Sequence, residues 1–383
     1  MSKRCSRCIM DDSSDTTILF DEQGRCNYCT SAISLMNKIY FPGTTELGKG
    51  NIRLDALIAD VKKEGKDKKY DCIMGLSGGL DSSYLAYLGY KWGLSVLAVH
   101  IDDGFDTEIS KSNLRKLVDA TGFDYEVITP DAEQFNDLEL AYLKAGVPNI
   151  AVPQDNVLFA FLYAKMKEYG IKYFLSGGNY ALECILQQGN TYTANDVVNI
   201  KDIHKRFGTK PINHLRFISR FQRFWNEKRN GIKSPRPLNY IDYNRERAFE
   251  ELREFCGFEY YGRKHLENIF TAFCQLYWMP KKFGVDKRTS HLSSMIVSGQ
   301  MTRDEALREF EEPIYDEKMM REYIDIIKGR LHITDSEFDA IMKAPSHQHT
   351  DYKTEDDTLC YKLLGMAVKF RAGFKQRAHE RYN

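Results

Sequence analysis

Apolar positions between residues 70 and 176 follow two periods in turn, one typical of strands and one typical of helices. Residues 70–76 and 94–101 are short, nearly continuous apolar runs, as in strands buried on both faces. After the first run, apolar residues recur at helical spacing at Leu80, Tyr84, Leu85 and Leu88. The same patterns predict helices at 52–63, 109–121, 131–145 and 155–169 and strands at 124–129 and 171–176. This alternation predicts a parallel sheet with right-handed crossovers, in which ligands bind at the carboxyl ends of the strands.

The pattern differs on both sides of this α/β region. The first 45 residues show little periodicity, and so short a segment needs a metal or a neighbouring domain to be stable. After about residue 186 the strand pattern fades, and residues 302–305 and 334–337 have the sequence of capping boxes that begin helices. We therefore expect three parts: a module at 1–45, an α/β domain at 46–190 and a mainly helical region at 191–383, which would bind substrate or partners.

A glycine-rich turn, GLSGGLDSS at residues 75–83, follows the first predicted strand and begins the next helix. Glycines let the backbone approach a ligand closely, and the free N–H groups of a helix N-terminus attract phosphate. Asp81 would repel a phosphate unless a divalent cation lay between them, which indicates Mg²⁺. An ordinary strand–turn–helix connection with serine caps is the alternative. The candidate phosphate-binding residues are Gly75, Ser77, Gly78, Gly79, Asp81, Ser82 and Ser83.

The string SGGLDSS resembles the SGGxDS signature of the PP-loop ATP pyrophosphatases, which split ATP into AMP and pyrophosphate and so activate an oxygen atom of the acceptor. The resemblance implies that His100 and Asp102, at the end of the second strand, lie beside the nucleotide; a solvated turn is the alternative. It also implies a second nucleotide-facing loop after a later strand, at Gly177, Gly178 and Asn179. Glu183, one helical turn after Asn179, would lie on the same face of the helix as Asn179.

Four cysteines in the first 45 residues form two Cys-x-x-Cys pairs, and 17 residues separate the pairs. Cysteine thiolates at this spacing can surround one tetrahedral Zn²⁺, and four protein ligands leave no open position, so the predicted site is structural. An iron–sulfur cluster, a redox pair and plain buried thiols are the alternatives. The predicted ligands are Cys5, Cys8, Cys26 and Cys29.

Charge is balanced over the whole chain but not along it. The 54 Lys and Arg residues cancel 54 Asp and Glu residues, which argues against a surface built throughout for nucleic acid. Residues 201–236, here called the basic segment, nevertheless contain eleven Lys or Arg and two acids, interleaved with aromatic residues. The basic segment could bind RNA, a nucleotide diphosphate or an acidic partner, or it could be a solvated face whose aromatic residues lie in the core.

A second basic group lies at residues 279–293, around a proline and a glycine. Such a loop can supply cations to a leaving pyrophosphate or to a substrate carboxylate, and a plain surface loop is the alternative. We select Lys282 and Lys287 as candidate catalytic residues alongside Asp81. Arg288 and His291, together with Glu183, are candidate substrate-binding residues.

Two remaining features restrict the prediction. No run approaches the ~18 apolar residues of a spanning helix, and the N-terminus lacks the apolar region of a secretory signal, so we expect a cytoplasmic protein with reduced thiols. The pair His347-x-His349 has no obvious third ligand, so it carries little weight as a metal site.

Four stretches together look like the N-acetyl sugar amidotransferases of bacterial surface-polysaccharide biosynthesis, which includes lipopolysaccharide O-antigen. They are the two cysteine pairs, SGGLDSS, GGNYALE at 177–183 and FGVDKRTSHLSSMIVSGQMTRDEAL at 283–307. The resemblance implies an adenine nucleotide alpha hydrolase-like, Rossmann-like PP-loop fold. It also implies that ATP adenylates the oxygen of an acetamido group on a sugar nucleotide, and that ammonia then displaces AMP to give an acetamidino group. One departure is that an acidic residue is expected where Gly178 stands.

The resemblance also implies that ammonia comes from separate glutaminase and cyclase-like subunits. An N-terminal nucleophile glutaminase needs Cys at position 2, where this sequence has Ser2. Nucleic acid is not an expected partner. A PP-loop enzyme that thiolates tRNA and a nucleotide-binding protein without turnover are the alternative functions.

Overall fold

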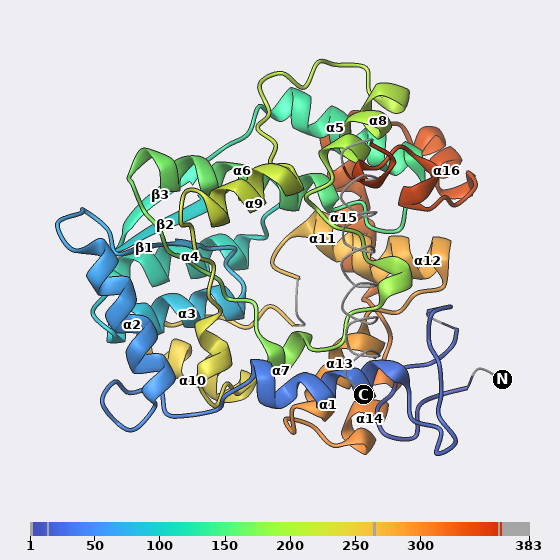
Figure 1. Ribbon diagram of the computed structural model, residues 1–383. Coiled ribbons are helices and arrows are strands. Elements are labelled where there is room, and N and C mark those ends of the chain that lie inside the picture. Colours follow the sequence, from blue (N-terminus) through green and yellow to red (C-terminus); the bar gives the residue numbers. More distant parts are fainter. Residues whose placement is uncertain (1–2, 14, 263–265, 359–360, 362–383) are drawn as a thin grey trace, which may run out of the picture.

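A four-stranded sheet lies on one side of the computed structural model, at the left in Figure 1; the model describes residues 3–13, 15–262, 266–358 and 361. All neighbouring strands are parallel, in the order β3-β2-β1-β4. This confirms the predicted α/β fold class with a parallel sheet. The elements of the α/β region are α2 (Ile52–Gly65), β1 (Cys72–Gly75), α3 (Leu80–Lys91), β2 (Val96–Ile101), α4 (Glu108–Thr121), β3 (Asp124–Ile128), α5 (Ala132–Ala145), α6 (Val152–Glu168), β4 (Phe174–Leu175) and α7 (Tyr180–Glu183).

Side chains of the central strands alternate between two apolar layers. Met74 of β1 packs in one cluster with Leu85 of α3 and Leu117 of α4. Its neighbour Ile73 packs on the other face with Leu162 of α6. Each Å² of apolar surface that is buried stabilises the fold by about 25 cal/mol. Because both faces of these strands are buried, apolar residues are favoured at every position.

The predicted helices at 52–63, 109–121, 131–145 and 155–169 are present as α2, α4, α5 and α6. The last predicted strand, at 171–176, is shorter than expected. β4 contains two residues and pairs with β1 over that length only, while Tyr173, just before it, forms an isolated bridge with Lys233 of the basic segment. The N–H groups of Phe174 and Ser176 donate to the carbonyl oxygens of Lys233 and Pro235, so this stretch also pairs with the basic segment on its other side.

The rest of the chain is mainly helical, as predicted (Figure 1). The capping boxes expected at Thr302 and Thr334 are both formed, with Glu305 and Glu337. Among the described residues, no helix is both long and apolar enough to cross a lipid bilayer. The helices are α8 (Val197–Phe207), α9 (Arg220–Lys228), α10 (Arg245–Cys256), α11 (Ile269–Phe273), a π-helical turn (Cys274–Trp278), α12 (Met279–Phe283), α13 (Arg288–Val297), α14 (Arg303–Glu311), α15 (Glu317–Leu331) and α16 (Asp335–Lys343), with 3₁₀ turns at Gln188–Asn190, Pro237–Tyr240, His349–Asp351 and Glu355–Asp357.

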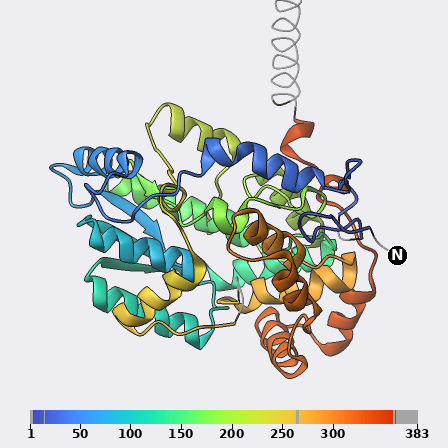
Figure 2. The same ribbon diagram turned by 90° about the horizontal axis from the view of Figure 1, so that it is seen from below.

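The N-terminal segment packs against the helices of the C-terminal half, far away in sequence (Figure 2). It contains α1 (Asn27–Ile39). Arg303, the first residue of α14, donates hydrogen bonds to the carbonyl oxygens of Cys8 at 3.1 Å and Cys5 at 3.2 Å. The Ile9 N–H donates to the Ser293 hydroxyl of α13 at 3.2 Å. These contacts supply the neighbouring structure that so short a segment needs.

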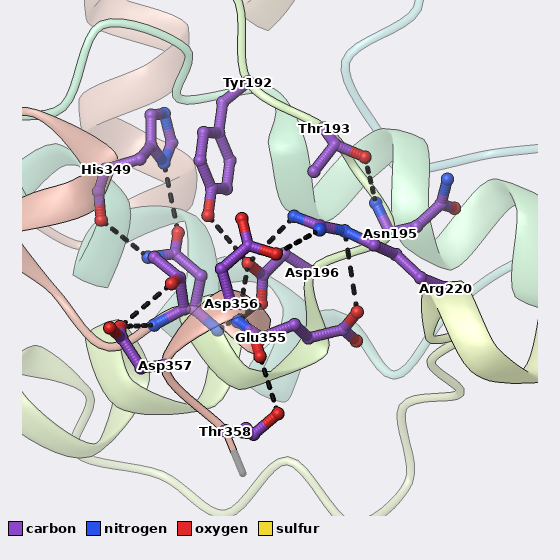
Figure 3. A network of polar contacts seen from close by, with 12 residues as sticks. Tyr192, Thr193, Asn195, Asp196, Arg220, His349, Glu355, Asp356, Asp357 and Thr358 are labelled. Atoms are coloured by element: carbon purple, nitrogen blue, oxygen red, sulfur yellow. Dashed lines mark hydrogen bonds and ion pairs between the residues drawn. The ribbon is translucent and has the colours of Figure 1, made fainter. Parts of the chain in front are cut away.

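A polar network fastens residues 349–358 to α8 and to the start of α9 (Figure 3). Arg220 forms ion pairs with Asp356 at 2.9 Å, Asp196 at 3.5 Å and Glu355 at 3.6 Å. The ring of His349 stacks on Tyr192 with centroids 4.2 Å apart, and burial lowers the pKa of His349 to about 3. His349 is therefore a neutral core residue, and a metal-binding role for the His347-x-His349 pair gains no support from its position.

Candidate functional site

Two glycine-rich turns, at the carboxyl ends of β1 and β4, line one cavity of about 250 Å³. They are adjacent because β4 pairs with β1. A Cβ on Gly177 would lie 3.1 Å from both the carbonyl carbon of Asp81 and the amide nitrogen of Ser82. Only glycine therefore lets the second turn lie so close to the first turn of α3. The structure brings together the two turns that the sequence placed beside a nucleotide.

The first turn leaves the start of α3 directed toward the cavity. Gly79, the N-cap, offers no side-chain hydrogen bond to the helix. Gly78 has a φ of +77°, and a Cβ there would lie 2.8 Å from Ser110 of α4. The Ser77 N–H donates to the Ser82 hydroxyl at 3.3 Å, which holds the turn closed. Because a helix N-terminus carries partial positive charge, this geometry suits an anion such as phosphate.

Two tyrosines support this turn from elsewhere in the chain. The Tyr261 hydroxyl accepts a hydrogen bond from the Leu80 N–H at 2.7 Å. The Tyr243 hydroxyl donates to Oδ1 of Asp81. Burial, and then the charge of Asp81, raise the pKa of Tyr243 well above its ordinary value, so this phenol stays protonated and remains a donor.

A second carboxylate, Glu267, lies against the same turn. A Cβ on Gly79 would be 2.6 Å from Oε1 of Glu267. An isolated antiparallel bridge between Asp106 and Asn268 holds this part of the chain at the end of β2. Asp81 and Glu267 both line the cavity, and carboxylate oxygens are ligands that Mg²⁺ prefers.

The remaining walls of the cavity are largely apolar. Side chains of α6 and β4 form one wall, and aromatic residues of α10 and of the segment after it form another. A cavity with polar groups at one end and apolar walls at the other fits a phosphorylated ligand that carries a flat ring. The main apolar lining residues are Leu158, Phe159, Leu162, Phe174, Phe249 and Phe258.

His100 does not line the cavity but supports the turn from below. Nδ1 lies 2.7 Å from the carbonyl oxygen of Leu76, and Nε2 lies 2.8 Å from Oδ2 of Asp106. Both partners can accept a hydrogen bond, so the protonated ring, which has a donor at each nitrogen, satisfies both contacts. Burial lowers the pKa of His100, but the hydrogen bond and charge of Asp106 outweigh it, so the pKa lies above 6.5.

We expect Asp106→Asn to lower the pKa of His100, because the carboxylate that stabilises the imidazolium is lost. A raised folded-state pKa gives stability that is complete below the unfolded pKa and is lost as pH rises through the folded pKa. The variant should therefore lose this contribution at lower pH than the native protein does. Melting temperatures from about pH 5 to 9 test this. Asp351→Asn, in the exposed pair with His347, is the control; equal pH profiles for the native protein and Asp106→Asn would contradict the assignment.

Asp102 belongs to an acidic group behind the cavity. The carboxylate oxygens of Asp102, Asp103 and Asp106 lie within 4.8 Å of one another. Asp103 accepts two hydrogen bonds of 3.1 Å from Asn268, the N-cap of α11, and burial raises the pKa of Asp103 to about 6. Asp102 accepts the Gly104 N–H at 2.8 Å. These contacts show how the end of β2 is fastened to the C-terminal region.

A second cavity of about 130 Å³ adjoins the first and shares Leu182, Glu183, Arg245 and His291 with it. Lys287 lies on the wall of the second cavity, and burial lowers the pKa of its ammonium group. Within the described residues, that ammonium group has no hydrogen-bond or ion-pair partner. It is therefore available to an anionic ligand.

Gly178 stands where the family resemblance leads one to expect an acidic residue. A Cβ at this position would lie 3.4 Å from Nε of Arg236 and 3.5 Å from Oε2 of Glu183. An acidic side chain at 178 would meet the Glu183 carboxylate. The carboxylate of Glu183, which comes from one helical turn further along the chain, therefore lies where the side chain of an acidic residue at 178 would be.

Arg288 also lines the second cavity, but its guanidinium group is held by protein atoms. It pairs with Asp286 at 2.8 Å and donates to the carbonyl oxygen of Glu312 at 2.8 Å. It also stacks over the ring of Phe310, 5.0 Å from the ring centre. These contacts tie the start of α13 to the end of α14.

Three other predicted residues lie outside the first cavity. The Lys282 ammonium group donates to two backbone carbonyls at the end of α16, at 2.8 and 2.9 Å, where a cation is favourable. Ser83 is fully buried. The Asn179 side chain accepts the Leu182 N–H at 2.9 Å as the N-cap of α7. The structure does not bring Lys282 to the site. Ser83 and Asn179 pack at the starts of α3 and α7 without facing the first cavity.

The four N-terminal cysteines form a compact, fully buried cluster whose sulfur atoms all lie within 4.8 Å of one another. Sγ of Cys5 is 3.7 Å from that of Cys29, and Sγ of Cys8 is 3.6 Å from that of Cys26. Four sulfurs about 2.3 Å from a tetrahedral zinc ion would be about 3.8 Å apart. The Cys26 N–H also donates to Sγ of Cys5 at 3.1 Å, which stabilises negative charge on sulfur. The cluster therefore fits a metal ion.

Sequence reasoning missed Tyr243, Tyr261, Glu267 and Arg245. None lies in a recognisable motif, and each reaches the site only through the packing of α10 and of the segment that precedes α11. The one available signal was for Glu267, an acid directly before the Asn268 cap, but this pattern is common at helix starts.

The parallel sheet and the paired glycine turns define the class: this is an α/β protein whose candidate site lies at the carboxyl ends of two neighbouring strands. Residues 267–367 match the sequence model of the family described as LPS biosynthesis protein WbpG-like, C-terminal domain. The C-terminal part of the chain is therefore similar to this lipopolysaccharide-biosynthesis family, which confirms the resemblance to surface-polysaccharide proteins. No curated protein sequence matches the chain significantly.

Similar solved structures include an NMN synthetase from Francisella tularensis, with 15% identity and a TM-score of 0.35 over 74% of this chain and 95% of that one. An NH3-dependent NAD synthetase from Campylobacter jejuni has 14% identity and a TM-score of 0.29 over 77% of this chain and 96% of that one.

Proposed function

We propose that the protein is an ATP-dependent amidotransferase that converts an acetamido group of a sugar nucleotide into an acetamidino group in surface-polysaccharide biosynthesis. The observation that carries the proposal is the shared wall of the two cavities. The glycine turns of the PP-loop region line the first cavity, and Lys287 and His291 of the lipopolysaccharide-biosynthesis domain line the second. A phosphate-binding site and an acceptor site would thus be in direct contact.

The reaction needs adenylation because an amide oxygen is a very poor leaving group. The acetamido oxygen attacks the α-phosphorus of ATP, the bond to the β-phosphate oxygen breaks, and pyrophosphate leaves. Ammonia then adds to the imidate carbon, the carbon–oxygen bond breaks, and AMP leaves with the former acetamido oxygen. The product is an amidinium group.

The residues divide between the two steps. Backbone N–H groups at the start of α3 would hold the leaving pyrophosphate and stabilise the negative charge that develops on it as its bond to the α-phosphorus breaks. Lys287 and Arg245 would hold the anionic part of the acceptor. Glu183, on the wall common to both cavities, would take the proton that ammonia loses.

Two metals fit the residues present. Asp81 and Glu267 would hold Mg²⁺, which when bound screens the charge of the triphosphate. The four-cysteine cluster would hold Zn²⁺, and because all four ligands come from the protein, its role would be structural. We further propose that separate glutaminase and cyclase-like subunits supply the ammonia.

Thiolation chemistry gains no support from the site. Cys184 is the thiol nearest in sequence to the second glycine turn, and burial raises its pKa to about 11, so it is protonated at neutral pH. A thiol in that state is a weak nucleophile.

An oxygen-transfer experiment tests the proposal. Incubation of the protein with ATP, Mg²⁺, ammonium salt and acetamido sugar nucleotides labelled with ¹⁸O in the acetyl group should move the label into AMP. Pyrophosphate should appear only when the acceptor is present. Pyrophosphate release without acceptor, or AMP free of label, would overturn the proposal.

A further inference from the structure

α9 presents an aromatic face to solvent. None of its residues is buried, and Phe221, Phe224 and Trp225 are 57%, 55% and 50% exposed. Their spacing of three and four residues places them on one side of the helix, and the rings of Phe221 and Trp225 lie 6.1 Å apart. Adjacent large aromatic side chains on an exposed face mark an interaction surface.

Exposed positive charge lies at the end of α9. The helix belongs to the basic segment, whose sequence has eleven cations and two acids, although Arg220 at its start is paired with three acids from outside the segment. Glu227, the acid on α9, pairs with Arg223 at 3.3 Å, so its charge is compensated. Lys228 and Arg229, at the end of the helix, are exposed. The face is therefore both aromatic and cationic.

Tyr361 lies beside the start of α9. The guanidinium carbon of Arg220, the first residue of α9, lies 5.7 Å from the ring centre of Tyr361. The sequence after Tyr361 is basic, with six Lys or Arg and one Glu in 22 residues.

We propose that the exposed face of α9 binds an anionic membrane surface, with its rings among the lipid headgroups and the cations at the end of the helix on lipid phosphates. Aromatic and apolar residues on one helix face with Lys and Arg around them are the pattern of helices that lie in a membrane interface. Clustered cations are attracted to anionic lipids. A convex helix with protruding rings suits a deformable lipid surface better than a preformed protein groove. The proposal does not depend on the catalytic function.

Vesicle binding tests this with the full-length protein. The protein should sediment with vesicles of phosphatidylcholine and phosphatidylglycerol but not with phosphatidylcholine alone, and salt should weaken binding. Trp92 and Trp278 are 2% and 0% exposed, so a blue shift in tryptophan emission on binding would report Trp225.

The double variant Phe221→Ser, Phe224→Ser keeps Trp225 as the reporter. It should bind at least about 10-fold more weakly, while pyrophosphate release is unchanged. Ile52→Ser removes an apolar side chain that is 80% exposed on α2 and should bind as the native protein does. No binding to anionic vesicles, equal binding by the double variant, or binding to RNA or an acidic protein in place of vesicles would overturn the proposal.

Discussion

Asp81→Asn is expected to lower acceptor-dependent pyrophosphate release by about 10²–10³-fold, the size of effect seen when one electrostatic group is removed from an active site. Asparagine has nearly the same shape, and its side-chain oxygen can still accept the hydrogen bond from Tyr243. The fold should therefore survive, and the loss should come from the missing charge that would hold Mg²⁺ beside the phosphates. Initial rates of pyrophosphate release over a range of Mg²⁺ concentrations measure the effect.

Tyr243→Phe is the matched control, because it removes the hydrogen bond and keeps the carboxylate. Its rate should fall by about 10-fold, as expected for one hydrogen bond to a charged group worth roughly 1.5 kcal/mol. If Asp81→Asn retained the native rate, or if Tyr243→Phe lost as much activity as Asp81→Asn, the role given to the Asp81 charge would be incorrect.

Cys26→Ser should abolish metal binding and lower the free energy of unfolding by about 5 kcal/mol, less than the ~10 kcal/mol or more that isolated zinc modules gain from their metal. The loss should be smaller here because the segment also packs against α13 and α14. Cys26 is the N-cap of α1, and serine is a better cap than cysteine, so the change should not harm the helix itself. Metal content by elemental analysis and urea unfolding curves measure the two effects.

Cys256→Ser, at the end of α10 and away from the cluster, provides the comparison. It should keep one metal ion per chain and change stability by less than about 1 kcal/mol. A native metal content in Cys26→Ser, or iron in place of zinc in the native protein, would contradict the proposed site.

The strands and the glycine turns could be predicted because each depends on neighbouring residues. An uninterrupted apolar run such as 94–101 is stable only when both faces of the strand are covered. Gly78 reaches its positive φ without strain, and Gly177 leaves room for the start of α3, so the glycines themselves indicated the turns. These features belong to short stretches of the chain.

The difference between Lys282 and Lys287 could not be predicted. Both are cations in one short stretch, but α12 ends at Phe283, and the chain turns at the next residue, Gly284, whose φ is +66°. Lys282 therefore faces the end of α16, and Lys287 faces the second cavity. Tyr243 depends on contacts across 162 residues of sequence in the same way. The positions of these three side chains depend on packing between residues far apart in the sequence, so the local sequence pattern could not predict them.

The β-bridge between Asp106 and Asn268 joins the α/β region to the C-terminal region, and this joint restricts how C-terminal regions can be exchanged between related proteins. Asn268 caps α11, bridges to Asp106 and donates to both oxygens of Asp103, and Glu267 beside it lies over Gly79. An engineer who exchanges C-terminal regions between relatives at residue 267 would cut through the wall of the cavity that both glycine turns line. A working chimera would need this short joint copied together with the transplanted domain.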